Sequence, residues 1–239
     1  MHQLVVAAGI DPEKVHRIPI GVDLANFPLV DEAGRTRARA ELGIPESAFV
    51  VGSFVKDGVG LGDGSEPKLV KGPDTLVAVL ARLHDEIPEL VVLLTGPARG
   101  YVQRELESRG VALRHALLET RADLGRAYHA LDVTLVASRQ EGGPKAVLES
   151  LAAGVPLVTT RVGQAPELLT AGEDGLLAAV DGGDALAAAV SRIHAAAALA
   201  GNLREAGRLK AEANSDERLD GRWAALLDGF VQKGSSRVG

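Results

Sequence analysis

The sequence predicts an α/β fold with a doubly wound parallel sheet of about six strands. Short runs of β-branched residues and Leu alternate with segments of helical periodicity, as expected for strands that helices cover on both faces. Aromatic residues make up only 3% of the 239 residues and apolar residues 46%, so Ala, Val and Leu must build the core. This composition favours helices packed on a parallel sheet over an aromatic-rich β-sandwich. The length favours a single large domain, since chains divide into separate cores beyond about 250 residues.

The predicted strands and helices alternate along the chain. Strands are expected at residues 49–54, 90–95, 111–118, 132–137, 155–160 and 175–180, the third having the weakest pattern. Helices are expected at residues 73–86, 102–108, 122–130 and 144–153, with a short helix near Glu167. A helix between consecutive strands is the crossover that parallel pairing requires, so we expect right-handed βαβ units.

The two ends of the chain fall outside this alternation. We expect residues 1–30 to form an irregular linker or entry segment, residues 31–200 the sheet domain, and residues 201–239 crossover helices and a tail. The alanine-rich stretch 183–231 is predicted to be helical, and the tail from Lys233 to Gly239 to be disordered.

The last predicted helix carries an apolar stripe at helical spacing, formed by Leu219, Trp223, Leu226 or Leu227, and Phe230. Two interpretations are open. In the first, the stripe packs on the sheet, as the apolar face of a helix in a globular domain usually does. In the second, it docks on a neighbour outside the chain, and its exposure would favour self-association.

Composition excludes several classes of function. The net charge is −6 with acidic and basic residues interspersed, so no basic face for nucleic acid is expected. The absence of Cys excludes disulfides and thiol catalysis and fits a reducing cytoplasm. No apolar run reaches the roughly 18 residues of a spanning helix, and the six His residues lack metal-ligand spacing. We therefore expect a soluble cytoplasmic protein with no metal site.

The turn after the strand at 132–137 has the composition of an anion site. Gly142 and Gly143 permit close backbone approach, and Pro144 stands where a first helical residue is expected. The N–H groups of Lys145 and Ala146 are then free at the positive end of the helix dipole. The Lys145 side chain can add a further charge. This turn is therefore a candidate phosphate site.

Two carboxylates, Glu141 and Glu149, bracket this turn eight residues apart. Carboxylates that accept from sugar hydroxyls, with a diphosphate on the backbone donors between them, would describe a nucleotide-sugar site. On spacing alone a plainer interpretation stays open, in which Glu149 is a solvated helix residue and Glu141 a charge at the helix entrance.

The segment from Glu141 to Glu149, followed by Ser-Leu-Ala-Ala-Gly-Val-Pro-Leu-Val, resembles the E-x7-E signature of retaining glycosyltransferases of family 4 (glycosyl transferases group 1, GT-B fold). Further resemblances occur in the expected order over about residues 15–180. They are Ile18-Pro-Ile-Gly-Val-Asp23, Lys71-Gly72, Asp132-Val-Thr-Leu-Val-Ala-Ser138 and Val162-Gly-Gln-Ala-Pro-Glu167. Ile20 replaces the usual Asn in the first of these, and Gln164 replaces a Gly in the last.

The resemblance implies roles for the matching residues. Glu141 would hold hydroxyls of the transferred sugar and Glu149 the ribose, while Lys71 would neutralise phosphate charge that grows as the sugar–phosphate bond breaks. The base would lie against the backbone near Leu117 and Leu118, by position only. The full donor-binding set is Gly142, Gly143, Pro144, Lys145, Ala146, Glu149, Leu117 and Leu118.

One departure from the family concerns charge. Ser53 stands where the family usually has Arg, and Lys56, in a long glycine-rich loop expected to be flexible, is a candidate for the missing cation. The alternative interpretation of Lys56 is a solvated loop lysine. The glycines of this loop do not form a dinucleotide fingerprint, because Asp63 or Ser65 stands at the third position.

The resemblance also implies the partners. The donor would be a UDP- or GDP-sugar, used without a metal, since the family needs no Asp-x-Asp and the chain has none. The acceptor would be a glycan, a lipid or a small molecule, bound mainly by an N-terminal domain supplied in cis or in trans. That domain could place the protein peripherally at a membrane.

Three hypotheses for the function follow. The first is the donor domain of a retaining, hexosyl-type glycosyltransferase, because the chain is expected to begin at the inter-domain linker. The second is a nucleotide-sugar-binding module without transferase activity of its own. The third, a sugar-nucleotide epimerase of the same architecture, fits the context of the E-x7-E segment less well.

Overall fold

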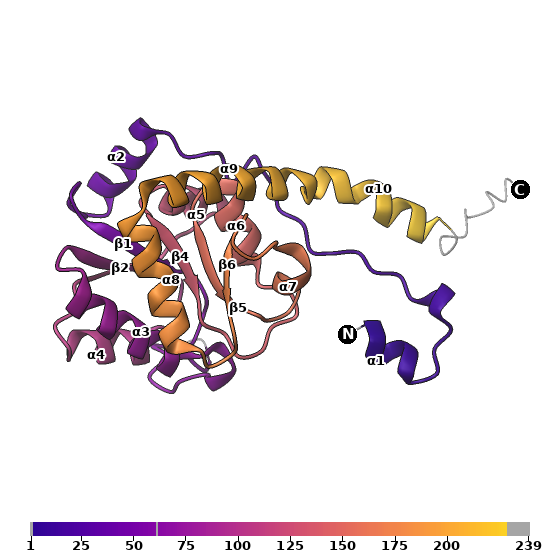
Figure 1. Ribbon diagram of the computed structural model, residues 1–239, viewed down its shortest axis with the longest axis horizontal. Coiled ribbons are helices and arrows are strands. Elements are labelled where there is room, and N and C mark those ends of the chain that lie inside the picture. The colour runs from indigo at the N-terminus through magenta and orange to yellow at the C-terminus, as the bar shows by residue number, and fades with distance from the viewer. Residues whose placement is uncertain (1, 61, 229–239) are drawn as a thin grey trace, which may run out of the picture.

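The central sheet consists of six parallel strands in the order β3-β2-β1-β4-β5-β6 (Figure 1). The structure is a computed structural model that describes residues 2–60 and 62–228. The strands are β1 (Phe49–Ser53), β2 (Leu90–Thr95), β3 (Leu113–Ala116), β4 (Val133–Val136), β5 (Leu157–Thr160) and β6 (Leu176–Ala178). This order belongs to the doubly wound folds, in which the winding reverses between the first and fourth strands. The predicted fold class is confirmed.

Helices cover both faces of the sheet. One face carries α3 (Pro73–Glu86), α4 (Gly100–Glu107) and α8 (Gly183–Ala195), and the other carries α2 (Glu32–Glu41), α5 (Arg121–Tyr128) and α6 (Lys145–Ala153). Along β1, Val51 joins the apolar cluster of the first face and Val50 that of the second. Both residues are fully buried, because successive side chains of a strand point to opposite faces.

The edge strand β3 is shorter than the predicted 111–118. Its two end residues are half-buried and its two middle residues are exposed, whereas all of β1, β2 and β4 is buried. An edge strand pairs on one side only, here with β2. None of its four side chains is buried, which accounts for its weak apolar pattern in the sequence.

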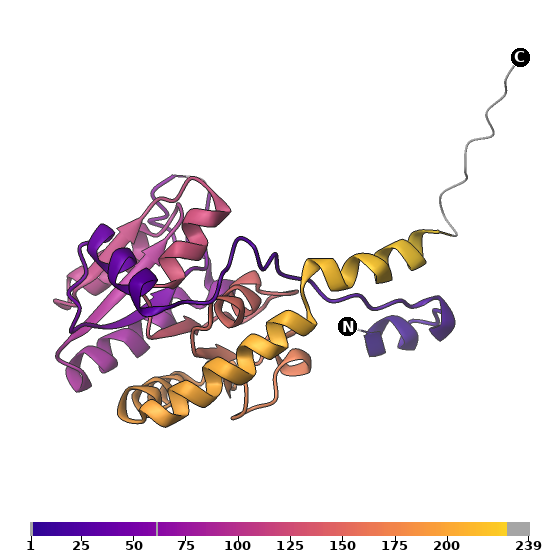
Figure 2. The same cartoon turned by 90° about the horizontal axis from the view of Figure 1, so that it is seen from above.

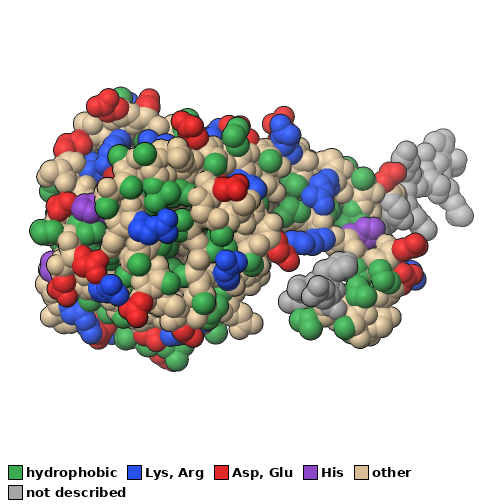
Figure 3. Space-filling model, viewed as in Figure 1, with side chains coloured by type: hydrophobic (Ala, Val, Ile, Leu, Met, Phe, Trp, Pro, Cys, Tyr) green, Lys and Arg blue, Asp and Glu red, His purple; other side chains and the backbone are tan. Residues whose placement is uncertain are grey.

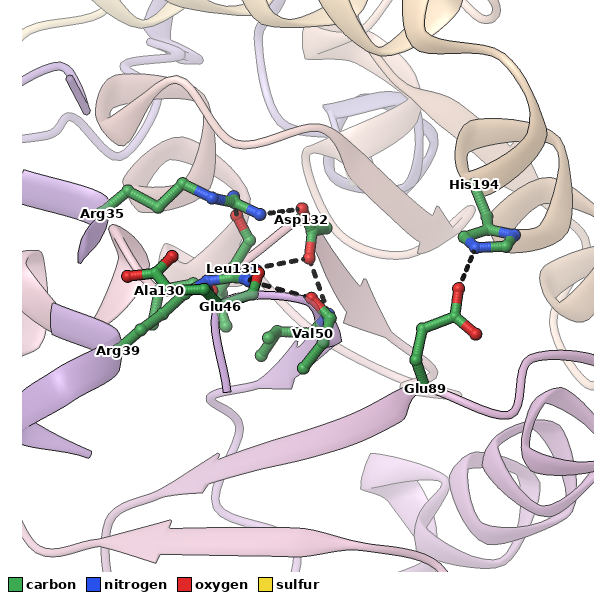
Figure 4. Close-up of polar contacts among 10 residues, drawn as sticks. Arg35, Arg39, Glu46, Val50, Glu89, Ala130, Leu131, Asp132 and His194 are labelled. Atoms are coloured by element: carbon green, nitrogen blue, oxygen red, sulfur yellow. Dashed lines mark hydrogen bonds and ion pairs between the residues drawn. The ribbon is translucent and has the colours of Figure 1, made fainter. Parts of the chain in front are cut away.

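Helix α2 has no counterpart among the helices predicted from the sequence. Asp31 caps it by accepting a hydrogen bond from the Gly34 N–H at 2.6 Å. Its fully buried Arg39 donates to Asp132 Oδ2 at 2.8 Å, and that oxygen also accepts from the Val50 N–H at 2.7 Å (Figure 4). Arg35 donates to the other oxygen of Asp132 at 2.6 Å. Asp132 thus ties α2 to the entrance of β4 and to β1.

The terminal segments differ in part from the predictions. Residues 1–30 are not wholly irregular, because they contain α1 (His2–Ala7) and a 3₁₀ turn, η1 (Pro12–Lys14). The stretch 183–231 is helical over its described part, as predicted, and consists of α8, α9 (Ala197–Ala213) and α10 (Asp216–Leu227), with a bend of 105° between α8 and α9. The domain boundary expected between residues 200 and 201 falls inside α9, so no helix end coincides with it.

The helix α10 leaves the body of the protein and runs beside the N-terminal segment (Figure 2). Val22 and Ser215 form an isolated parallel β-bridge between the two segments. Arg222 Nη2 donates to the Arg17 carbonyl at 2.7 Å. Of the predicted stripe, Leu219 is buried, Leu226 is half-buried, and Trp223 and Leu227 are 46% and 47% exposed. The expectation that this stripe packs on the sheet is therefore wrong. Phe230 and the tail from Lys233 lie outside the described residues.

The surface shows mixed charge. In the view of Figure 3, acidic and basic side chains are interspersed over the sheet domain, without a continuous basic patch on that face. Within the described residues, no single helix has both the length and the apolar character needed to cross a membrane, whereas α8 and α9 satisfy the length and composition criteria only as a bent pair.

Candidate functional site

The candidate site lies where the strand order reverses, at the carboxyl ends of β1 and β4. In open α/β sheets this crevice is the usual ligand site, because the loops that follow the two strands diverge there. The 3₁₀ turn η2 (Leu69–Lys71) comes from the loop after β1, and the turn from Ser138 to Pro144 follows β4. The N–H groups of Arg139 and Gln140 both donate to the Val70 carbonyl, at 2.9 and 3.0 Å. These bonds join the two loops.

Gly72 allows the loops to approach. It has φ +63°, and a Cβ at this position would lie 2.1 Å from the carbonyl oxygen of Ala137, the residue directly after β4. Any side chain would collide with backbone here and would also be strained by the left-handed conformation. Glycine at position 72 therefore sets Lys71 against the end of β4.

Lys71 and Glu141 form an ion pair in this crevice. Lys71 Nζ donates to Glu141 Oε1 at 2.6 Å, and Ser138 Oγ donates to the same oxygen at 2.9 Å. The two side chains of the ion pair are 21% and 11% exposed, so the pair is screened from water on most sides. An ammonium group with three donors can keep this contact and still donate to an anion beside it. The structure thus brings together two of the three predicted catalytic residues.

The turn before α6 presents free backbone donors. The sequence predicted Pro144 as the first residue of this helix. In the structure it lies one position earlier, because α6 begins at Lys145. The N–H groups of Lys145 and Ala146 make no hydrogen bond within the described part of the chain. Gly142 is exposed, and a Cβ added there would meet nothing within 4 Å. Two unpaired N–H groups at a helix N-terminus, beside a lysine and an open glycine, can bind an anion.

Glu149 lies in the second turn of α6 and is 7% exposed. Its Oε2 accepts a hydrogen bond from the Tyr128 hydroxyl at 3.2 Å, and Arg121 Nη2 lies 3.8 Å from its Oε1. Burial raises the pKa of Glu149 above its usual value, while Tyr128, Arg121 and Lys145 act in the opposite direction. The interpretation of Glu149 as a solvated helix residue is therefore wrong. A buried carboxylate with one oxygen bound and the other without a hydrogen bond among the described residues can accept from a ligand hydroxyl.

Three of the predicted residues lie apart from this group. Lys56 is exposed and forms no ion pair with Glu141 or Glu149. Leu117 is 71% exposed and Leu118 is half-buried, and both line a cavity of about 380 Å³ between the turn after β3 and the helices α2 and α5.

A buried arginine that sequence reasoning missed lies against Ser53. Arg99 is 1% exposed and donates to the Ser53 carbonyl at 2.6 Å and to Asp57 Oδ1 at 3.0 Å. A guanidinium from the turn after β2 thus occupies the neighbourhood of Ser53, and Asp57 compensates its charge. One sequence signal could have pointed to Arg99. It directly follows a Gly-Pro-Ala turn, and the chain has serine at position 53, where the family usually has Arg.

The start of α4 also holds the loop after β1. The carbonyls of Asp63 and Gly64 accept from the N–H groups of Gly100 and Tyr101 at the start of α4, at 2.6 and 2.9 Å. A Cβ at Gly64 would meet the Ala98 backbone at 2.2 Å. The described part of this loop is therefore docked on α4.

Gln164, which replaces a family glycine, lies beside the turn that carries Glu141. Its Oε1 accepts from the Ile20 N–H at 3.1 Å, and a Cβ at Gly143 would lie 3.3 Å from its Cδ. Gln164, Glu141 and Ile20 line a cavity of about 540 Å³ together with residues of the N-terminal segment. The amide therefore ties this segment to the site. No group of three or more potential metal ligands occurs among the described residues.

Residues 63–196 match the family model described as "Glycosyl transferases group 1". D-inositol 3-phosphate glycosyltransferase from Xylanimonas cellulosilytica is 35% identical, over 96% of this chain and 54% of that protein. The protein of the same name from Segniliparus rotundus is 31% identical, over 92% of this chain and 46% of that protein. The chain thus spans about half the length of these curated relatives.

Solved structures show the same fold. HepE from Anabaena, in complex with UDP and glucose, matches with a TM-score of 0.79 at 22% identity, over 95% of this chain and 60% of that one. Sucrose-phosphate synthase from Thermosynechococcus elongatus matches with a TM-score of 0.78 at 25% identity, over 95% and 56%. The C-terminal domain of a glycosyl transferase group 1 family protein from Francisella tularensis is covered over 97% of its length, with a TM-score of 0.65 and 16% identity. The family model covers more than half of the 239 residues, and the chain belongs to the glycosyl transferases group 1 family.

Proposed function

We propose that this chain binds a nucleotide-diphosphate sugar at the carboxyl ends of β1 and β4 and serves as the donor-binding part of a retaining, hexosyl-type glycosyltransferase. The observation that carries the proposal is the Lys71–Glu141 pair beside the free N–H groups of α6. A cation from the loop after β1, together with a carboxylate and two backbone donors from the turn after β4, suits a diphosphate joined to a polyol.

Each residue then has a part in the reaction. The diphosphate lies on the N–H groups of Lys145 and Ala146, and Glu141 accepts from hydroxyls of the transferred sugar. Glu149, one helical turn further, accepts from the ribose. Lys71 donates to the phosphate oxygens and stabilises the negative charge that develops on the diphosphate as the bond from the sugar carbon to its oxygen breaks.

In this proposal the transfer proceeds with retention of configuration at the sugar carbon. The acceptor hydroxyl forms its new bond to the sugar carbon on the face that the diphosphate leaves, and its proton passes to the departing diphosphate oxygen. Glu141 is held by Lys71 and Ser138 and so acts in binding the sugar. The acceptor, a glycan, a lipid or a small molecule, is bound mainly by a further domain in cis or in trans. HepE has been solved with UDP-glucose, which makes UDP the first nucleotide to test.

Calorimetric titration of the 239-residue chain with UDP, GDP and ADP, and with their glucose conjugates, tests the proposal. We expect saturable binding of one nucleotide, strengthened by its sugar. Replacement of Lys71 by Met should weaken binding of the diphosphate about tenfold or more, since it removes a charged donor. Lys14→Met, at an exposed position of the η1 turn, is the control and should bind as the wild-type chain does. Absence of binding by every nucleotide, in the chain that retains its fold, would overturn the proposal.

A further inference from the structure

A tyrosine from another helix contacts the buried carboxylate of Glu149. Tyr128 is the last residue of α5 and is fully buried. Its ring lies edge-on to Phe27, with centroids 5.9 Å apart, and to Phe54, with centroids 4.6 Å apart. These two contacts fix the ring, so the hydroxyl has one position, at the buried side of α6.

The hydroxyl faces two acceptors on α6. It lies 3.2 Å from Glu149 Oε2 and 3.4 Å from the Ala146 carbonyl, and its single proton can serve one of them at a time. A carboxylate is the stronger acceptor, so the proton belongs to Glu149 when Glu149 is ionised. Because Oε2 is held from the buried side, Oε1 points toward Arg121, whose side chain is 48% exposed.

We infer that Tyr128 is a positioning residue for nucleotide binding: its hydroxyl holds one oxygen of Glu149 so that the other is presented to the vicinal hydroxyls of a ribose. The inference rests on the proposed function, in which Glu149 binds that ribose. The ligand class is then a ribonucleoside diphosphate, and the selective part of the contact is the diol.

The charged and titratable groups that face Glu149 are few. They are Tyr128 and Arg121 from α5 and Lys145 from α6. The hydrogen bond from Tyr128 lowers the pKa of Glu149 against the effect of burial. A tyrosine that only filled space would leave both the titration of Glu149 and the discrimination of the diol unchanged, and this difference separates positioning from packing.

The test compares Tyr128→Phe with Tyr101→Phe, which removes the hydroxyl of the only other tyrosine. Tyr101 packs with the cluster on the opposite face of the sheet, so it is a matched control for loss of a phenolic oxygen. Titration with UDP, GDP and ADP at pH 7 should show about three- to tenfold weaker binding in Tyr128→Phe and no change in Tyr101→Phe. The 2′,3′-dideoxy form of the nucleotide that binds should show no difference between Tyr128→Phe and the wild-type chain. Equal losses for both forms would overturn the inference.

A second measurement does not depend on nucleotide binding. Carbon NMR titration of the Glu149 carboxyl, assigned by its loss in Glu149→Gln, should give a higher pKa in Tyr128→Phe than in the wild-type chain. An unchanged pKa would overturn the inference even if a nucleotide binds. A raised pKa in a chain that binds no nucleotide would instead uphold the effect of Tyr128 on Glu149 and contradict the proposed function.

Discussion

Lys71 and Glu141 are 70 residues apart in the sequence and 2.6 Å apart between Nζ and Oε1. Each belongs to a different loop, and the loops meet where the winding of the sheet reverses between β1 and β4. The pair therefore depends on the sheet topology and on the approach that Gly72 permits.

Replacement of Glu141 by Ala should affect the sugar and not the nucleotide. Because Glu141 is assigned to hydroxyls of the transferred sugar, we expect affinity for the nucleotide-sugar to fall by about 1–3 kcal/mol while affinity for the bare nucleotide changes little. Paired calorimetric titrations with UDP and UDP-glucose, or with the GDP pair, measure the difference. Glu173→Ala, at an exposed loop position, is the control. Equal losses for both ligands would show that Glu141 is wrongly assigned.

Replacement of Gly72 by Ala should destabilise the protein strongly. The new Cβ would lie 2.1 Å from the Ala137 carbonyl oxygen at φ +63°. Gly110→Ala is a matched control, since Gly110 has φ +72° and nothing within 4 Å of its Cβ position. The control should lose about 1–2 kcal/mol from the left-handed conformation alone, and Gly72→Ala distinctly more. Urea unfolding measures both, and equal losses would mean that the close approach to Ala137 contributes nothing.

Replacement of Arg99 by Met should leave Asp57 buried without its cation. Asp57 is 2% exposed, and its Oδ2 has no hydrogen bond among the described residues. Removing one partner of a buried ion pair costs about 3–5 kcal/mol, so we expect a loss of that size in urea unfolding. The double replacement Asp57→Leu with Arg99→Met should recover much of it, because no charge is then left buried. A double variant as unstable as the single one would contradict this account.

Replacement of Glu149 by Gln should stabilise the folded chain while it weakens ligand binding. Burial raises the pKa of Glu149 in the folded state, so the folded protein binds this proton more tightly than the unfolded one. The ionised carboxylate therefore lowers stability above the folded-state pKa, and this cost disappears as the pH falls through that pKa toward the unfolded value.

Urea unfolding of the wild-type chain and of Glu149→Gln checks this sign. Near pH 7 the variant should be the more stable, and the difference should shrink as the pH approaches 4. Nucleotide affinity at pH 7 should fall, because the amide accepts less strongly from a ribose hydroxyl than a carboxylate does. A variant less stable than the wild-type chain at pH 7 would show that the ionised carboxylate is fully compensated by its neighbours.

Local patterns carried much of the sequence prediction. Buried strands alternating with helices indicated the doubly wound sheet, because a strand covered on both faces has to be apolar throughout. The turn and helix start between Glu141 and Glu149 could also be predicted, because Gly142, Gly143 and Pro144 directly precede the helix in the chain. Helix α2 was missed because its anchors are buried arginines: Arg39 is fully buried, yet in a sequence it has the pattern of a solvated residue.

By itself, then, the sequence determined the sheet class and the free backbone donors of the turn before α6, because both depend on residues close together in the chain. Only the tertiary structure could show that Gly72 brings Lys71 to Glu141, that Tyr128 reaches Glu149 from another helix, and that Arg99 lies against Ser53. Only the tertiary structure could also show that Trp223 and Leu227 of α10 are exposed, because the apolar stripe has the same helical periodicity whether or not it is packed. Contacts between distant segments depend on how strands are ordered in the sheet, and periodicity along the chain does not contain that order.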